Sequence, residues 1–219
     1  SFAVYKADGA LSVEVLDRVY TADVDGNVFA SVDGEYTVVI GDNIVHVTVL
    51  NGIAAFNVGI LNVGKYVASV IFNGSDNYNA GINESAFEVT QSGTNFNIVA
   101  NESNITYGNS INVTQSLPAD ATGNITYFFA DGKVTKVLNV GESFVLSGLD
   151  VGSYVVYANY SGDSNYAPAR DSLTITVNNA VNNILVFGED GVYLENSTIV
   201  VVADVDGVYA VNVSGKKVR

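Results

Sequence analysis

Apolar and polar residues alternate along most of this chain. In residues 154–160 every second position, Tyr154, Val156, Ala158 and Tyr160, is apolar, and this two-residue period is that of a strand with one buried face. Glycine and asparagine interrupt such segments at short, even intervals, and no segment has the period of a helix. The pattern therefore predicts an all-β protein built as a sandwich or a barrel.

One seventeen-residue segment occurs in two related copies. NVGKYVASVIFNGSDNY lies at residues 62–78 and DVGSYVVYANYSGDSNY at residues 150–166. Gly64 aligns with Gly152, 88 residues later, and the same offset joins Val89 to Val177. A fixed period of this length indicates tandem repeats.

The two ends of the chain continue the repeat. Its first residues resemble the strand near residues 85–89, and residues 192–218 match residues 19–45 in length and pattern. We therefore expect a window from a longer protein. Its parts are the last strand of a preceding repeat at 1–10, complete domains at 11–92 and 93–180, and the first half of a third repeat at 183–219.

Each complete repeat has the length of a seven-stranded sandwich. In the second repeat the strands are expected at residues 95–101, 110–115, 124–130, 133–138, 142–147, 153–161 and 172–178.

The motif Leu-x-Val-Gly-x-Tyr begins the repeated segment and resembles the tyrosine corner of immunoglobulin-like sandwiches. The resemblance implies tandem immunoglobulin-like, seven-stranded antiparallel β-sandwiches in an elongated array. Tyr66 and Tyr154 would begin the sixth strand and bond to the preceding backbone, and Gly64 and Gly152 would relax the corner. The chain has no cysteine, so packing alone would hold each sandwich together.

The segment ends in a second motif, Asn-Gly-Ser-Asp-Asn-Tyr at 73–78 and Ser-Gly-Asp-Ser-Asn-Tyr at 161–166. It resembles the Gly-Asp-x-Asn-Tyr signature of bacterial-type Ig-like repeats, which are abundant in adhesin-like cell-surface proteins of methanogenic archaea. Ser75 replaces the signature aspartate in the first copy. The resemblance implies an extracellular, non-enzymatic module, and we expect the signature residues to cap each sandwich: Asn77, Tyr78, Asn165 and Tyr166.

The formal charge is −14, from 23 acidic and 9 basic residues. Such a chain would repel nucleic acid and anionic membranes, and no apolar run reaches membrane-spanning length. We expect neither nucleic acid nor membrane insertion in this segment. The missing cysteines exclude a thiol nucleophile, and no acid–base pair recurs in the repeats, so we expect no enzyme and no cofactor.

The sequence ADVDG at residues 22–26 gives one candidate for calcium. Asp23, Asp25 and Asn27 have the one-residue spacing of calcium loops, but Gly34 stands where such a loop needs glutamate. A turn with aspartate at its start and glycine at a positive-φ position is the alternative.

Asn-x-Ser/Thr sequons are more frequent than the composition predicts, and none has proline in the middle. Outward polar residues of a β-protein would give the same pattern, and the two interpretations are compatible. The candidate glycosylation sites are Asn73, Asn83, Asn101, Asn104, Asn112, Asn124, Asn159, Asn196 and Asn212.

Two functional hypotheses remain open. The first is a structural, adhesin-like stalk or fibre whose partners are neighbouring repeats of the same protein or of adjacent copies. The second is a module that recognises a cell-surface glycan or protein through loops or edge strands, or a subunit of an extracellular filament. Tyr157 and Tyr5 are candidates for exposed recognition residues.

Overall fold

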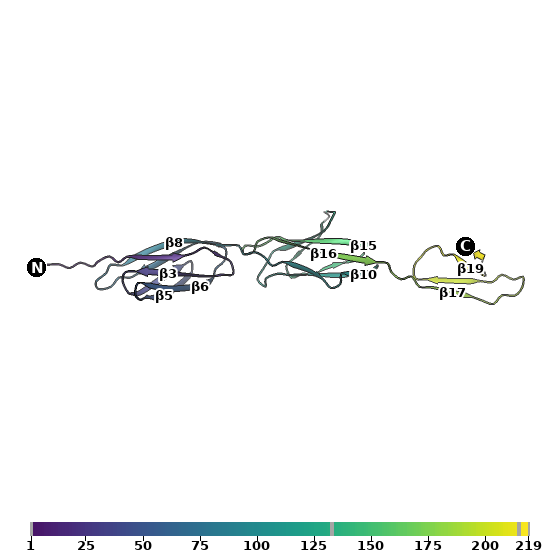
Figure 1. Cartoon of the computed structure of the whole chain (residues 1–219), viewed down its shortest axis with the longest axis horizontal. Helices are drawn as coiled ribbons and strands as arrows, with labels where there is room; N and C mark the ends of the chain where they lie inside the picture. The colour runs from purple at the N-terminus through teal and green to yellow at the C-terminus, as the bar shows by residue number, and fades with distance from the viewer. Residues whose placement is uncertain (1, 132–133, 214–215, 219) are drawn as a thin grey trace.

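The computed structural model describes residues 2–131, 134–213 and 216–218. Two sandwiches and a smaller C-terminal unit follow one another end to end, and together they form a rod (Figure 1). We call them sandwich 1 (residues 11–90), sandwich 2 (residues 97–178) and the C-terminal unit (residues 184–218). Across the described residues, no helix has the length and apolarity needed to span a membrane.

Sandwich 1 consists of a three-stranded sheet in the order β1-β3-β6 and a five-stranded sheet in the order β2-β8-β7-β4-β5. Its strands are β1 (Leu11–Val15), β2 (Arg18–Val19), β3 (Asp23–Ala30), β4 (Gly34–Ile40), β5 (Asn43–Val49), β6 (Ile53–Ile60), β7 (Gly64–Phe72) and β8 (Gly81–Thr90).

Sandwich 2 has the same topology, with sheets β14-β11-β9 and β10-β16-β15-β12-β13. Its strands are β9 (Asn97–Ala100), β10 (Asn104–Thr106), β11 (Ile111–Ser116), β12 (Asn124–Phe129), β13 (Val134–Asn139), β14 (Phe144–Leu146), β15 (Gly152–Tyr160) and β16 (Ala169–Asn178). Residue 133 of the expected strand 133–138 lies outside the described residues.

The first strand of each sandwich is divided between the two sheets. The strand ranges expected from the sequence did not include this division. In sandwich 1, β1 pairs antiparallel with β3, whereas β2 pairs parallel with β8. In sandwich 2, β10 pairs parallel with β16, so one pair of each five-stranded sheet departs from the antiparallel expectation. The side chain of Ile105 explains why the chain crosses to the second sheet at β10. Its neighbours in β10 are polar, and Ile105 alone inserts a buried side chain into the core.

Each sandwich has its own apolar core between the sheets. The alternating strand positions supply it, as the sequence pattern predicts. In sandwich 2 the largest fully buried side chains are Tyr127 and Tyr160. The described residues include no buried polar or charged residue, so each fold rests on apolar packing and on the backbone bonds of the sheets.

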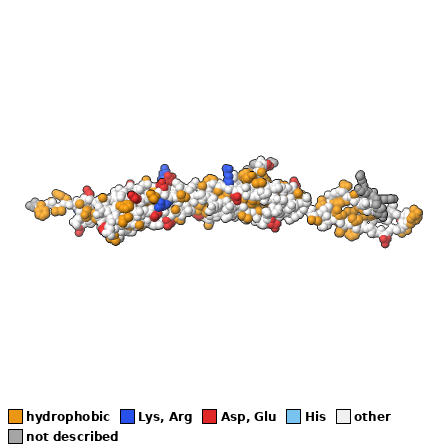
Figure 2. All heavy atoms as spheres, viewed as in Figure 1, with side chains coloured by type: hydrophobic (Ala, Val, Ile, Leu, Met, Phe, Trp, Pro, Cys, Tyr) orange, Lys and Arg blue, Asp and Glu red, His pale blue; other side chains and the backbone are white. Residues whose placement is uncertain are grey.

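The C-terminal unit contains two small sheets, β17 (Ile184–Gly188) with β18 (Ile199–Ala203) and β19 (Val211–Val213) with β20 (Lys216–Val218). Ile184 pairs with Ala203 as Leu11 pairs with Ala30 in sandwich 1. Apolar side chains remain exposed along β17, and orange atoms gather over this part of the rod (Figure 2).

Candidate functional site: the joint between the sandwiches

The start of β7 and of β15 has tyrosine-corner geometry. The Tyr66 hydroxyl donates to the carbonyl of Asn62 at 2.9 Å, and the Tyr154 hydroxyl donates to the carbonyl of Asp150 at 2.9 Å. Both rings are half-buried, although a tyrosine corner predicts buried rings, because the corner lies at the rim of the sandwich.

The two corner glycines do not have positive φ. A Cβ atom on Gly64 would lie 3.4 Å from the Tyr66 ring, and one on Gly152 would lie 3.7 Å from the Tyr154 ring. A Cβ atom at these distances would be in ordinary van der Waals contact, so neither the backbone conformation nor the space at the corner requires glycine.

The signature loop between β15 and β16 depends on Gly162. Its φ is +74°, and a Cβ atom there would lie 2.8 Å from the Pro168 nitrogen and 2.9 Å from the Tyr166 oxygen. In sandwich 1, Gly74 has φ +85°, and a Cβ atom there would lie 3.0 Å from the Ala80 nitrogen and from the Tyr78 oxygen. Only glycine satisfies both conditions, which explains why the motif carries glycine in both copies.

Asp163 organises this loop in sandwich 2. Its Oδ1 accepts from the amides of Asn165 and Tyr166, both at 2.8 Å, and its Oδ2 accepts from the amide of Thr122 at 2.7 Å. Desolvation pushes the pKa of Asp163 upward, but these backbone hydrogen bonds outweigh it and lower the pKa to about 2. The carboxylate is therefore ionised at neutral pH.

Sandwich 1 keeps the backbone turn without the carboxylate. The Ser75 amide donates to the Tyr78 carbonyl at 3.0 Å, as the Asp163 amide does to the Tyr166 carbonyl at 3.0 Å. The serine substitution noted in the sequence thus removes the side-chain bonds and leaves the turn in place.

Each signature loop holds the segment that leads into its own sandwich. In sandwich 2, the Ser92 amide donates to the Asn165 carbonyl at 3.0 Å, and the Ala167 amide donates to the Ser92 carbonyl at 2.9 Å. Gln91 adds a side-chain bond to the Asp163 carbonyl at 2.7 Å. The loop therefore binds the linker, residues 91–96, through a parallel bridge between Ser92 and Tyr166.

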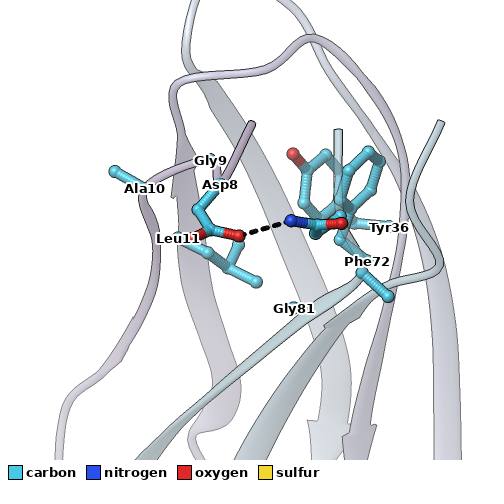
Figure 3. Close-up of a pocket in the computed structure, with 9 residues that line it drawn as sticks. Asp8, Gly9, Ala10, Leu11, Tyr36, Phe72 and Gly81 are labelled. Atoms are coloured by element: carbon cyan, nitrogen blue, oxygen red, sulfur yellow. Dashed lines mark hydrogen bonds between the residues drawn. The ribbon is translucent and has the colours of Figure 1, made fainter. Parts of the chain in front are cut away.

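The same contacts recur at the outer end of sandwich 1. The Ala7 amide donates to the Asn77 carbonyl and the Asn79 amide donates to the Ala7 carbonyl, both at 2.9 Å. Asn79 also donates to the Asp8 carboxylate at 2.8 Å (Figure 3). A cavity of about 210 Å³ lies beneath this segment, against the stacked rings of Tyr36 and Phe72.

The joint between the sandwiches adds side chains from both sides. The rings of Tyr20 and Tyr166 meet edge to face, with centroids 5.4 Å apart. Tyr20 donates to Oδ2 of Asp120 at 2.6 Å, and Tyr166 donates to Oδ1 at 2.8 Å. These two bonds, that of Tyr20 first, lower the pKa of Asp120, and the bond to Asp120 raises the pKa of the Tyr20 hydroxyl.

Asn165 fastens the other side of the joint. Its Oδ1 accepts from the Val63 amide at 3.1 Å, and its Nδ2 donates to the Asn62 side chain at 3.1 Å. Asn62 is also the residue whose carbonyl receives the Tyr66 hydroxyl. The tyrosine corner of sandwich 1 is therefore part of the surface that meets the signature loop of sandwich 2.

The comparisons with known proteins give one family match, and it falls on sandwich 2. Residues 98–178 match the family model described as bacterial Ig-like domain (group 3). The match spans nearly all of sandwich 2, and sandwich 1 has the same strand order, so both are Ig-like sandwiches. No curated protein matches the chain significantly.

Two solved structures are similar at low identity. The fibronectin(III)-like modules of CbhA from Clostridium thermocellum share 17% identity, with 76% of this chain and 94% of theirs covered and a TM-score of 0.35. The titin domains z1z2, solved in complex with telethonin, share 13% identity, with 81% and 100% covered and a TM-score of 0.39.

The calcium candidates lie on a strand of the first Ig-like sandwich and not in a loop. Asp23, Asp25 and Asn27 belong to β3. Asp25 pairs with Arg18, whose hydrogen bond lowers the pKa of the carboxyl, and Asp23 accepts from Asn57 at 3.2 Å. The turn expected at Gly26 is absent because β3 continues through it. Within the described ranges no three His, Cys, Asp or Glu side chains could hold a metal.

The sequons of the two Ig-like sandwiches and the C-terminal unit differ in accessibility. Asn83, Asn112 and Asn159 are half-buried in strands, and the Asn83 Oδ1 accepts from the Val13 amide at 3.3 Å. The sequon of Asn212 ends at residue 214, outside the described residues. The exposed asparagines are Asn73, Asn101, Asn104, Asn124, Asn196 and Asn212.

Sequence reasoning missed Tyr20 and Asp120. Tyr20 had a detectable signal, because Tyr107 occupies the same place in the second Ig-like sandwich: their amides donate to the Thr90 and Asn178 carbonyls, both at 2.8 Å. Asp120 had none, since Ser31 stands at its position in the first sandwich. Tyr107 is 52% exposed, and its hydroxyl has no partner among the described residues.

Proposed function

We propose that this chain is a non-enzymatic stalk or fibre segment of an adhesin-like, extracellular cell-surface protein. The observation that carries the proposal is the joint. A signature loop binds the preceding linker at two successive positions, and at the joint between the sandwiches Asp120 ties Tyr20 to Tyr166. Such contacts restrict rotation between neighbours, which a spacer needs and a loosely tethered array lacks.

The remaining parts of the proposal concern the surroundings of the stalk. The acidic exterior favours solubility at high local density, and the exposed asparagines are accessible to glycosylation. The partners are neighbouring repeats of the same protein or of adjacent copies, and the source class is an archaeal surface protein. The family match to sandwich 2 supports an Ig-like module.

A stalk grows by one module length for each module added. We would insert one or two further copies of residues 91–178 after residue 178 and measure the maximum dimension by small-angle scattering. Equal increments per copy are expected, because each inserted linker brings its own signature loop. Increments that fall with each copy would show bending joints and contradict the stalk.

The location is tested separately. Antibodies against sandwich 2 should label intact cells that carry the protein, and external protease should remove the label. Labelling that requires permeabilised cells would contradict the surface assignment but leave the stalk geometry untouched.

A filament subunit is the second candidate, and the C-terminal unit favours it. Its β17–β18 sheet leaves Leu185, Phe187 and Val200 about half exposed, and such a sheet can accept further strands of the same domain type. These would come from continuing sequence or from an adjacent copy. A monomer at high concentration in light scattering would argue against pairing between copies.

A further inference from the structure

A comparison of the two sandwiches separates side chains that their shared fold requires from side chains that it does not require. A side chain that is present in one sandwich and absent at the same strand position of the other is not required by the shared fold. The outer face of the five-stranded sheet of sandwich 2 carries an aromatic and cationic cluster of this kind, with no counterpart at the same positions of sandwich 1.

The cluster begins with two rings on adjacent strands. Phe128 on β12 pairs with Tyr157 on β15, and their rings stack with centroids 5.4 Å apart at an interplanar angle of 18°. Tyr157 in turn pairs with Ser172 on β16. A large ring beside a small serine leaves a cleft of about 530 Å³ over the sheet.

Polar side chains border this cleft, and those of Asn159 and Arg170 have no partner among the described residues. Asn159 pairs with Arg170 across β15 and β16. Within the described residues, neither the Asn159 amide nor the Arg170 guanidinium has a side-chain hydrogen bond or ion pair. Asp171 also lines the cleft, but its carboxylate accepts from the Ile98 amide at 2.7 Å and forms no ion pair with Arg170.

Sandwich 1 shows what the same positions look like without the cluster. The strand pairs Val39–Ser69, Ser69–Glu84 and Ile71–Ile82 correspond to Phe128–Tyr157, Tyr157–Ser172 and Asn159–Arg170. No ring and no cation is present there, and Ser69 donates to the Glu84 carboxylate at 2.9 Å. The fold therefore does not require the cluster.

We propose that Phe128, Tyr157, Asn159, Arg170 and Ser172 bind a hexopyranose that carries a carboxylate, such as a uronic acid residue of a glycan. The apolar C–H face of the sugar ring lies against the exposed Tyr157 ring. The guanidinium of Arg170 offers two parallel donors that match a carboxylate. The Asn159 amide and the Ser172 hydroxyl bond the ring hydroxyls, as expected for a cleft with few polar groups.

The charge at the cleft favours an acidic ligand over a neutral one. The chain has 9 basic residues against 23 acidic ones, and Arg170 keeps its positive charge unpaired among the described residues. A neutral sugar would leave this cation without a partner, and a peptide would need an open strand edge, which central strand β15 lacks.

The test uses ¹⁵N-labelled protein from a host that attaches no N-glycans, so that no sugar on Asn159 fills the cleft. It is titrated with methyl glucuronide and with methyl glucoside, which differ only in the carboxylate. We expect saturable amide shifts in β12, β15 and β16 with the glucuronide and at least about tenfold weaker binding of the glucoside.

Three variants make the proposal falsifiable. Arg170→Gln should weaken glucuronide binding at least about tenfold without changing glucoside binding, and Tyr157→Ser, the residue of sandwich 1, should weaken both. Glu84→Gln, at the matching face of sandwich 1, should change neither. Equal affinity for the two sugars, shifts centred on sandwich 1, or unchanged binding by Arg170→Gln would each overturn the proposal.

Discussion

Tyr20 and Tyr166 belong to different sandwiches, yet their rings meet edge to face and their hydroxyls donate to the same carboxylate. Tyr20 packs against buried residues of both cores. The relationship makes the joint a small extension of the two cores.

Replacing Tyr20 by alanine should loosen the joint and leave both sandwiches folded. The amides of Ser92 and Ala167, which bond across the linker, should then exchange with solvent at least about tenfold faster. Hydrogen exchange followed by NMR measures this directly. Tyr107→Ala is the matched control, because it removes the same tyrosine from a position without a joint partner, and it should leave both rates unchanged. Equal effects of the two variants would show that Tyr20 acts within its own sandwich.

Gly162→Ala should destabilise sandwich 2 by about 3 kcal/mol, because the substitution combines positive φ with a contact of 2.8 Å to the Pro168 nitrogen. Gly141→Ala is the control: Gly141 has φ +91° but no atom within 4 Å of the added Cβ, so it should cost about 1 kcal/mol. Denaturant unfolding, read from amide peaks of sandwich 2, gives both values. Similar losses of unfolding free energy in the two variants would mean that the short contact at Gly162 does not contribute to the cost of the substitution.

Tyr154→Phe should lower the stability of sandwich 2 by about 1 kcal/mol, the value of one hydrogen bond, because it removes the donor to the Asp150 carbonyl and keeps the ring. Tyr107→Phe, which loses a hydroxyl without a partner among the described residues, should be neutral. The same unfolding measurement compares the two variants. An unchanged free energy of unfolding for Tyr154→Phe would show that the hydrogen bond of the corner does not stabilise sandwich 2.

Sandwich 2 should be more sensitive to acid than sandwich 1. The pKa of Asp163 is lowered to about 2 and that of Asp120 is also lowered. A carboxyl whose pKa is lower in the folded state than in the unfolded state stabilises the fold. This stabilisation is complete above the pKa of the unfolded state, near 3.9, and is lost as the pH falls toward the pKa of the folded state. Ser75 and Ser31 stand at these positions in sandwich 1 and cannot titrate.

Amide peaks followed from pH 5 to pH 2 should therefore show sandwich 2 losing stability first. Asp163→Asn should already be less stable at pH 5 and should show a flatter dependence below pH 4. Parallel loss in the two sandwiches would indicate that other carboxyls dominate the response.

The strands and the repeat could be predicted from the sequence because both depend on the pattern of neighbouring residues. Alternation places Val156 and Ala158 inward, and the motif places the Tyr154 hydroxyl at the corner. Sequence reasoning missed β10, since three residues are too short to show a period. It also read ADVDG as a loop, because the polar residues of an exposed strand face have the spacing of calcium ligands.

The joint could be predicted only in part. The signature loop was visible as a motif, but its binding of the preceding linker joins residues 92 and 165, and nothing in the local pattern indicates such a contact. Asp120 is present in one repeat only, so even an internal comparison would not have selected it. The cluster around Tyr157 was likewise visible as a single outward tyrosine, whereas its stacking with Phe128 depends on strand register.

The central claim is that the signature loop and the Tyr20–Asp120–Tyr166 contact make the two sandwiches one stiff body. Residual dipolar couplings of the backbone amides in weakly aligned medium test it most directly. A single alignment tensor should fit sandwich 1 and sandwich 2 together, with the orientation seen in Figure 1. Two tensors of different magnitude, one for each sandwich, would show independent motion and contradict the account.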